Sequence, residues 1–263
     1  MWCDESASLL WVDILAGKLL RYWPASQRTE IHEMPRFTSA VLLTQTPEVF
    51  LLISQSGIFR YDFVTRAQTL LCPWPADDTR PNEAAIAPDG ALWFSSMDPD
   101  ARRIVGSWYR LAHAGAHLQV MLSNQWVPNT LQWFDGYLWF ADSLRKRFYC
   151  AKEHDGTLHI EHEWPVDGIP DGSALTCDGT LINARWGCAR LVYAALHHGE
   201  MTIQGELSLP ARQPSSCAFG GAERSDLFMT SALDGLAHPG ESDGALFTIK
   251  TTFTGMPANR FRL

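Results

Sequence analysis

The sequence predicts an all-β protein, a six-bladed β-propeller, from three observations. A short apolar phrase followed by small or polar residues recurs six times, at steps of 40, 42, 46, 43 and 46 residues. This period is typical of a propeller with one blade per repeat. Turn signals separate the repeats, and no segment has a convincing helical periodicity. The phrases are LLWVDI at Leu10, VFLLIS at Phe50, ALWFSS at Leu92, YLWFAD at Leu138, TLINAR at Leu181 and DLFMTS at Leu227.

In four of the repeats a turn signal comes just before the apolar phrase, and a further strand is predicted after the phrase. Asp-Gly pairs between apolar runs indicate hairpins, because glycine adopts a positive φ at little cost. Aromatic and β-branched residues then follow, as at 147–149, 190–193 and 245–249. The turn signals are Asp89-Gly90, Asp135-Gly136, Asp155-Gly156, Asp178-Gly179 and the polar stretch 224–226.

Composition predicts one domain spanning residues 1–263, since the six repeats occupy the whole chain. The net charge of −8 argues against nucleic-acid binding, which requires a basic patch. No apolar run reaches the ~20 residues that cross a bilayer. The first residues have neither a basic nor an apolar leader region, so we expect a cytoplasmic protein with no membrane partner.

The six cysteines form no Cys-x-x-Cys pair, and each lies in an apolar or turn context. We expect buried, reduced thiols rather than a zinc site or a disulfide framework. They are Cys3, Cys72, Cys150, Cys177, Cys188 and Cys217.

Polar residues recur at matched positions before four of the phrases. Asn82, Asn129, Asp171 and Ser216 lie 10, 9, 10 and 11 residues before their anchors. We expect them on the innermost strand of their blades, where equivalent positions converge on one rim of the channel. Amide and carboxylate oxygens there suit a hard cation. The alternative is that asparagine and aspartate simply cap turns before strands.

Histidine pairs are not predicted to bind metal. His159 and His162 lie in a strand-like run, where side chains three apart face opposite ways. His197-His198 precedes Gly199 and is typical of a turn. No Gly-x-Ser-x-Gly motif or glycine-rich phosphate loop is present, which argues against a serine hydrolase or a kinase.

Five motifs occur in order along the chain. The motifs are Trp2-Cys3-Asp4 with 10–14; Arg80-Pro81-Asn82-Glu83 with Asp89-Gly90 and 92–94; Asn129 with Ala141-Asp142-Ser143; Ile169-Pro170-Asp171-Gly172; and 215–221. Together they resemble the gluconolactonase and regucalcin (senescence marker protein) family of six-bladed propellers over essentially the whole length.

The resemblance implies a site for one divalent cation and a sugar. It places metal ligands at Asn129 and Asp171, and substrate contacts at Arg80, Asn82 and Glu83. Asp171 is also the candidate base that takes a proton from water. The alternative for Arg80 is a surface ion pair with Asp77 or Asp78.

Two residues are expected to support the side chain of Asn129. Asp142, with Ser143, is expected to orient the Asn129 side chain. The alternative for Asp142 is a turn acceptor at the end of a strand.

The chain also departs from the family pattern. The family's glutamate ligand lies before the position of Met1, so we expect an N-terminally truncated relative whose two remaining ligands bind metal weakly. Glu83 and Ala84 replace the usual aspartate and glycine. Arg102 and Arg103 lie where some relatives carry a carboxylate.

The predicted function is a metal-dependent hydrolase that opens a sugar lactone to its aldonic acid. The cation is expected to be Ca²⁺, with Zn²⁺, Mn²⁺ or Mg²⁺ as alternatives, and the protein a monomer or weak homodimer. The main alternative is a non-catalytic or metal-depleted propeller that binds a sugar acid or a partner protein. Hydrolysis of phosphotriesters or other esters is a third, because fold does not determine substrate.

Overall fold

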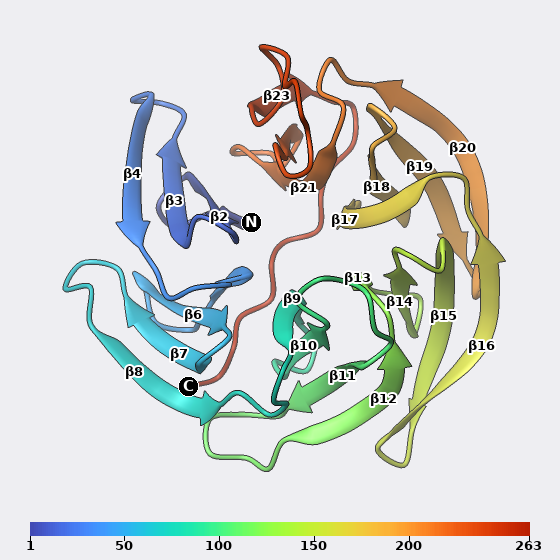
Figure 1. The fold of residues 1–263 in the computed structure, drawn as a ribbon. Coiled ribbons are helices and arrows are strands. Elements are labelled where there is room, and N and C mark those ends of the chain that lie inside the picture. The colour runs from blue at the N-terminus through green and yellow to red at the C-terminus, as the bar shows by residue number, and fades with distance from the viewer. The chain divides into compact units, whose positions relative to one another are not determined.

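The computed structural model describes residues 1–263, and they form strands, turns and loops without any helix. The strands make six antiparallel sheets, five of four strands and one of three, and within each sheet the strands follow in chain order (Figure 1). The all-β prediction is therefore confirmed. None of the elements is a helix long and apolar enough to cross a membrane.

The chain folds as two compact units, each described by itself below. The first unit comprises Met1–Pro128 and Ala258–Leu263, and the second comprises Asn129–Pro257.

The first unit contains three four-stranded sheets. Their strands are β1 (Trp2–Cys3), β2 (Ser8–Asp13), β3 (Lys18–Trp23) and β4 (Arg28–Glu33); β5 (Ala40–Leu43), β6 (Val49–Ser54), β7 (Gly57–Asp62) and β8 (Gln68–Pro73); and β9 (Arg80–Ile86), β10 (Leu92–Met97), β11 (Gly106–Leu111) and β12 (Gln119–Gln125).

The second unit contains two four-stranded sheets and one three-stranded sheet. Their strands are β13 (Pro128–Phe134), β14 (Tyr137–Asp142), β15 (Arg147–His154) and β16 (Thr157–Pro165); β17 (Ile169–Leu175), β18 (Thr180–Trp186), β19 (Arg190–His197) and β20 (Glu200–Ser208); and β21 (Pro214–Gly220), β22 (Asp226–Ser231) and β23 (Leu246–Lys250).

The six apolar phrases form the second strand of every sheet, as the repeat predicts. All six residues of β6 and of β10 are buried. Strands covered on both faces can carry several consecutive apolar residues, as at Phe50–Ile53 and Leu92–Phe94, because neither face meets water. Leu51, Phe94 and Phe261 are among the residues of one resulting core in the first unit.

The Asp-Gly turns lie between paired strands, which confirms the hairpin prediction. Asp135 and Gly136 join β13 to β14 with φ of 52° and 77°, and Asp155 and Gly156 join β15 to β16 with φ of 50° and 72°. Two successive positive φ values are the signature of a two-residue type I′ hairpin.

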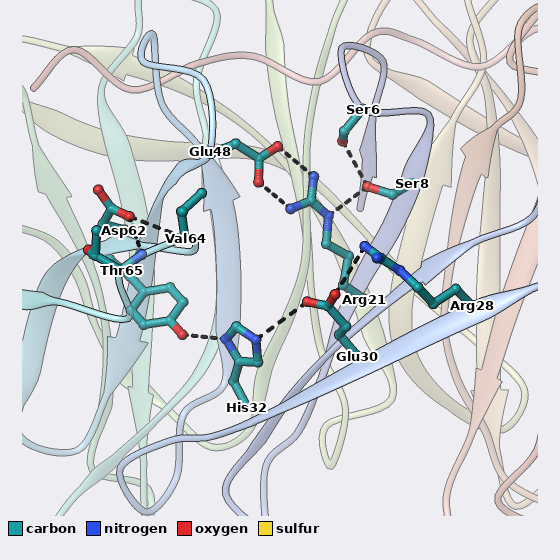
Figure 2. A network of polar contacts seen from close by, with 11 residues as sticks. Ser6, Ser8, Arg21, Arg28, Glu30, His32, Glu48, Asp62, Val64 and Thr65 are labelled. Atoms are coloured by element: carbon teal, nitrogen blue, oxygen red, sulfur yellow. Dashed lines mark hydrogen bonds and ion pairs between the residues drawn. The ribbon is translucent and has the colours of Figure 1, made fainter. Parts of the chain in front are cut away.

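A buried arginine joins the sheets β1–β4 and β5–β8 (Figure 2). Arg21, only 1% exposed, donates from both Nη atoms to the Glu48 carboxylate at 2.5 and 2.8 Å and from Nε to Ser8 Oγ at 2.9 Å. Its guanidinium also lies 4.7 and 4.5 Å from the ring centres of Trp23 and Phe63. A buried charge is tolerated when it is paired and hydrogen-bonded in this way.

The last residues of the chain pair with the second sheet. Phe261 is fully buried, and its N–H donates to Leu43 O at 2.9 Å while its carbonyl accepts from Gln45 N at 3.2 Å. Asn259 Nδ2 donates to Ile86 O at 2.9 Å. This segment therefore ties the first unit together after the chain has passed through the second.

The prediction of buried thiols is correct for only half of the cysteines. All six are unpaired, and Cys3, Cys150 and Cys217 are buried. Burial raises the pKa of Cys150 and of Cys217 to about 12, so neither ionises near neutral pH. Cys72 and Cys188 are half-buried and Cys177 is exposed, because these three lie at strand ends and turns.

Candidate functional site

Two of the first strands carry a β-bulge at the residues that the sequence singled out. In β17, Pro170 lies opposite Arg185 and Ser173 lies opposite Asn183, so β17 has one residue more than β18 around Asp171. In β9, the stretch from Pro81 to Ala84 opposes Ser96 to Phe94, again with one extra residue, around Asn82 and Glu83. Bulges re-aim side chains and are common beside active sites.

In the second unit, the structure brings Asn129, Ser143 and Asp171 together. Asn129, 6% exposed, donates from Nδ2 to Asp171 Oδ1 at 2.7 Å and to Ser143 Oγ at 3.2 Å. Ser143 Oγ in turn donates to Pro170 O at 2.6 Å. The serine hydroxyl thus holds the asparagine and the strand that carries Asp171 in one arrangement.

Asp142 lies one residue before Ser143 and is fully buried. Its Oδ1 accepts from Arg145 N at 3.2 Å, and its Oδ2 lies 3.6 Å from Arg145 Nε. These contacts correspond to the turn acceptor that the sequence left open as the alternative for Asp142. The hydroxyl of Ser143 makes the hydrogen bond to Asn129.

Thr130 and Asn183 complete this cluster, and sequence reasoning missed both. Thr130 is fully buried with a φ of 48°, an outlying conformation for a β-branched residue. Its Oγ1 donates to Asp171 O at 2.8 Å and lies 2.6 Å from Ser173 Oγ. Asn183 Nδ2 donates to Asp171 O at 2.6 Å. Two side chains therefore fix the backbone of Asp171.

Both missed residues left a signal in the sequence. Thr130 directly follows the candidate ligand Asn129, and its positive φ is one that glycine adopts more readily. Asn183 is a polar residue inside the apolar phrase TLINAR. A polar residue on a buried second strand needs partners, and here the partners belong to the candidate site.

The donors of this cluster fit a hard divalent cation. Asp171 offers carboxylate oxygens, and turning the Asn129 amide by half a turn would place its Oδ1 near the present position of Nδ2, 2.7 Å from Asp171 Oδ1. Two oxygens at such a separation can share one ion. Asn183 Oδ1 is a further buried oxygen without a hydrogen-bond partner.

Glycine is required directly after Asp171. A Cβ at Gly172 would lie 2.4 Å from Ser216 Oγ and 2.7 Å from Ser216 Cβ. Ser216 lies on β21 and was grouped with Asp171 by its register in the repeat. The close approach of β17 to β21 explains why the motif Ile169-Pro170-Asp171-Gly172 ends in glycine.

In the first unit, Arg80 and Asn82 contact each other. Arg80 Nη1 donates to Pro81 O at 2.9 Å and to Asn82 Oδ1 at 3.2 Å, and its guanidinium lies 5.7 Å from the Phe37 ring centre. Asn82 Nδ2 donates to Pro128 O at 2.9 Å. Both side chains are thereby held in defined positions and remain half-buried.

Glu83 is fixed within the bulge of β9. Its N–H donates to Ser95 Oγ at 3.0 Å, and its Oε1 accepts from Ala84 N at 2.9 Å. The carboxylate is half-buried. A longer side chain than the family's aspartate is therefore folded back onto its own backbone.

An open hollow of about 480 Å³ adjoins the start of β9. Arg103 Nη2 donates to Asp78 O at 3.1 Å, two residues before Arg80. The Arg102 N–H and the Arg103 guanidinium lower the pKa of Asp98, which is 3% exposed. The lining includes Gln55, Asp78, Asp98, Asp100, Arg102 and Arg103. Asp98 therefore neutralises part of the charge of Arg102 and Arg103, so these two arginines do not form a simple anion site.

Similarity to solved structures defines the class of protein. The chain resembles regucalcin from Agrobacterium tumefaciens, described as a calcium-binding protein, with a TM-score of 0.89 at 24% identity, covering 100% of this chain and 92% of that one. The fold is therefore a six-bladed β-propeller, as the six repeats and six sheets indicate.

The family follows from the sequence comparison. The model of the SMP-30/Gluconolactonase/LRE-like region matches residues 1–233, and the chain belongs to this family. It is 30% identical to an L-arabinolactonase of Azospirillum brasilense over 99% of this chain and 90% of that protein. It is 26% identical to a pentonolactonase of Haloferax volcanii over 99% of this chain and 92% of that protein.

Proposed function

We propose that this protein is a divalent-metal-dependent lactonase that opens a sugar lactone to its aldonic acid. The observation that carries the proposal is the bulge in β17, which holds Asp171 beside Asn129 in a largely buried, hydrogen-bonded cluster. The lactonase activities of two relatives similar over 99% of the chain support a lactone as the substrate class.

In this proposal Asn129 and Asp171 hold the cation, for which Ca²⁺ is favoured. Hard oxygen donors suit Ca²⁺, and a structurally similar regucalcin is a calcium-binding protein. When bound, such a cation supplies Lewis-acid polarisation of the lactone carbonyl.

The chain's own residues then carry out three tasks. Asp171 takes a proton from water while the water oxygen attacks the carbonyl carbon. The ring C–O bond breaks as the tetrahedral intermediate collapses, and Asp171 returns the proton that it took from water to the ring oxygen, which leaves as a hydroxyl. Arg80, Asn82 and Glu83 bind the sugar hydroxyls, for which the Arg80 guanidinium offers a planar set of donors.

Three supporting residues keep Asp171 in place. Ser143 holds Asn129, while Thr130 and Asn183 hold the Asp171 backbone. Such preorganisation matters because a base must lie within hydrogen-bond reach of the proton that it abstracts.

The test is hydrolysis of a panel of pentono- and hexono-lactones, followed by acid release, with Ca²⁺, Mg²⁺, Mn²⁺ or Zn²⁺ added singly to chelator-stripped protein. We expect metal-dependent turnover, and Asp171→Asn should lower kcat/KM by about 10²–10⁴-fold. Asp178→Asn is the matched control, because Asp178 is an exposed carboxylate in the turn that follows β17. Turnover of no lactone with any metal would overturn the proposal and favour a binding protein. Full activity in Asp171→Asn would overturn the assignment of Asp171 as the base.

A further inference from the structure

A second group of metal-ligating side chains lies in the second unit, outside the candidate site. Asp135, His197 and His198 each offer a ligand atom, and these atoms lie within 4.8 Å of one another. All three residues are exposed. The histidines are adjacent in sequence, but the carboxylate comes from a turn 63 residues earlier, which is why the sequence alone indicated only a turn at His197-His198.

The cluster is built from two hairpin turns. Asp135-Gly136 joins β13 to β14, and His198-Gly199 joins β19 to β20 with φ of 50° and 81°. The first position of such a type I′ turn favours asparagine, aspartate or glycine. Asp135 follows that preference and His198 does not.

The two turns are held against each other by contacts already present. His198 N donates to Asp135 Oδ2 at 2.8 Å, and His198 Nδ1 lies 3.0 Å from the same oxygen. Gly199 packs so closely on Tyr137 that an added Cβ would lie 2.9 Å from the tyrosine ring. The ligands therefore start close together, and binding an ion needs only small rotations of exposed side chains.

The chemistry of the donors selects the kind of ion. Two imidazole nitrogens and one carboxylate oxygen suit a borderline transition-metal ion such as Zn²⁺, whereas Ca²⁺ prefers oxygen ligands alone. The ring centres of His197 and His198 lie 3.9 Å apart.

This cluster lies at the other end of the strand that carries the candidate catalytic site. Asn129 is near the start of β13, whereas Asp135 follows its last residue. Six residues of extended strand correspond to roughly 20 Å. An ion here could not share ligands with Asn129 and Asp171.

We propose that Asp135, His197 and His198 form a binding site for a divalent transition-metal ion of the Zn²⁺ type, which links the β13–β14 hairpin to the β19–β20 hairpin. Three protein ligands leave the remaining coordination positions to water. Since the ligands come together only in the folded chain, the ion stabilises the folded state.

The test is calorimetric titration of the chelator-stripped full chain with ZnCl₂, in a buffer containing excess Ca²⁺ to occupy hard-oxygen sites. We expect one Zn²⁺ per chain, and about tenfold or greater weakening in each of His197→Gln and His198→Asn. His198→Asn is chosen because Asn-Gly is a preferred type I′ turn and so preserves the hairpin. Zn²⁺ should also raise the unfolding temperature of the unmodified protein, and His198→Asn should lose that rise.

His159→Gln is the matched control. His159 is an exposed histidine of β16 whose ring lies 6.2 Å from that of His154, and its loss should leave Zn²⁺ affinity unchanged. Absence of saturable Zn²⁺ binding would overturn the proposal. So would binding that survives in both histidine variants, or that is lost in Cys177→Ser, since the ion would then be bound by the exposed thiol.

Discussion

The sheets β1–β4 and β5–β8 use buried polar groups for cohesion, whereas β13–β16 and β17–β20 use them to hold one carboxylate. The first strand β5 is apolar and pairs with β6 residue by residue, from Ala40 opposite Ile53 to Leu43 opposite Phe50. The first strand β17 carries one extra residue around Asp171. The first strand of a blade thus serves only the packing of the core in β5. In β17 a single bulge turns the same strand into part of a polar site.

The Arg21 cluster and the Asp171 cluster also differ in how well their buried side-chain polar atoms are satisfied. Arg21 is paired with Glu48 and Ser8 (Figure 2). Its guanidinium also packs on aromatic rings. Around Asp171, Asn183 Oδ1 has no hydrogen-bond partner. Both clusters contain a left-handed residue, Glu48 in the first and Thr130 in the second, but only Thr130 is β-branched. Strain and unmet polar groups persist where function requires them. The comparison therefore separates residues that stabilise the fold from residues that serve the site.

The largest effect is expected from Gly172→Ala in the bulged strand. The new Cβ would meet Ser216, so β17 must shift and carry Asp171 with it. We expect kcat/KM to fall about 10²-fold, since a displacement near 1 Å has that effect. The free energy of unfolding should fall by about 1–3 kcal/mol. Lactone hydrolysis and urea denaturation measure the two quantities.

The matched control is Val41→Ala in β5. Val41 is buried, so its truncation should cost about 1–3 kcal/mol of stability while kcat stays unchanged. Gly172→Ala combined with Ser216→Gly should recover part of the lost activity, because the contact that forces the shift is removed. Equal losses of kcat in Gly172→Ala and Val41→Ala would erase the proposed difference between the two regions.

A smaller effect is expected at Thr130. Thr130→Gly relieves a backbone strain of about 1–3 kcal/mol but removes the hydroxyl bonds to Asp171 O and Ser173 Oγ, each worth about 1 kcal/mol. Stability should therefore change little, while kcat/KM falls about tenfold because Asp171 is held less firmly. Thr130→Ser keeps the hydroxyl and should retain activity. If the serine variant loses as much activity as the glycine variant, the hydroxyl does not position Asp171.

Periodicity predicted the fold because every blade repeats one buried strand. The phrases at Leu10, Phe50, Leu92, Leu138, Leu181 and Leu227 all became second strands, since continuous apolar runs have few alternatives in an all-β chain. The same register located Asn129 and Asp171 on the first strands of adjacent sheets.

The sequence could not predict how the site is assembled. A β-bulge depends on how two strands pair, and no residue type marks the extra position in β17. The contact of Thr130 with Asp171 spans 41 residues. The approach of Asp135 to His198 spans 63 residues. Interactions of this kind arise from packing between sheets and leave no local pattern.

The smallest effect concerns the first region and pH. His32 is buried, stacks on Phe63 at 4.2 Å and lies 2.5 Å from Tyr61 Oη through Nδ1. Burial, followed by the charge of Arg66, lowers the pKa of His32. As pH falls through about 6.5, the unfolded chain takes up a proton that the folded chain resists, so stability falls. The slope from this one group is at most about 1.4 kcal/mol per pH unit.

Urea denaturation at pH 7.5 to 5 should show this loss, and His32→Gln should lessen it. The range stops at pH 5 because the hydrogen bond from Arg21 lowers the pKa of Glu48, whose stabilising contribution is present above about 4.5 and is lost as pH falls through the lower folded value. His159→Gln should keep the slope, since His159 is exposed. If the free energy of unfolding of His32→Gln changed with pH as steeply as that of the unmodified protein, buried His32 would not contribute to the loss of stability in acid. The division between cohesion in β1–β8 and function in β13–β20 would then rest on the activity measurements alone.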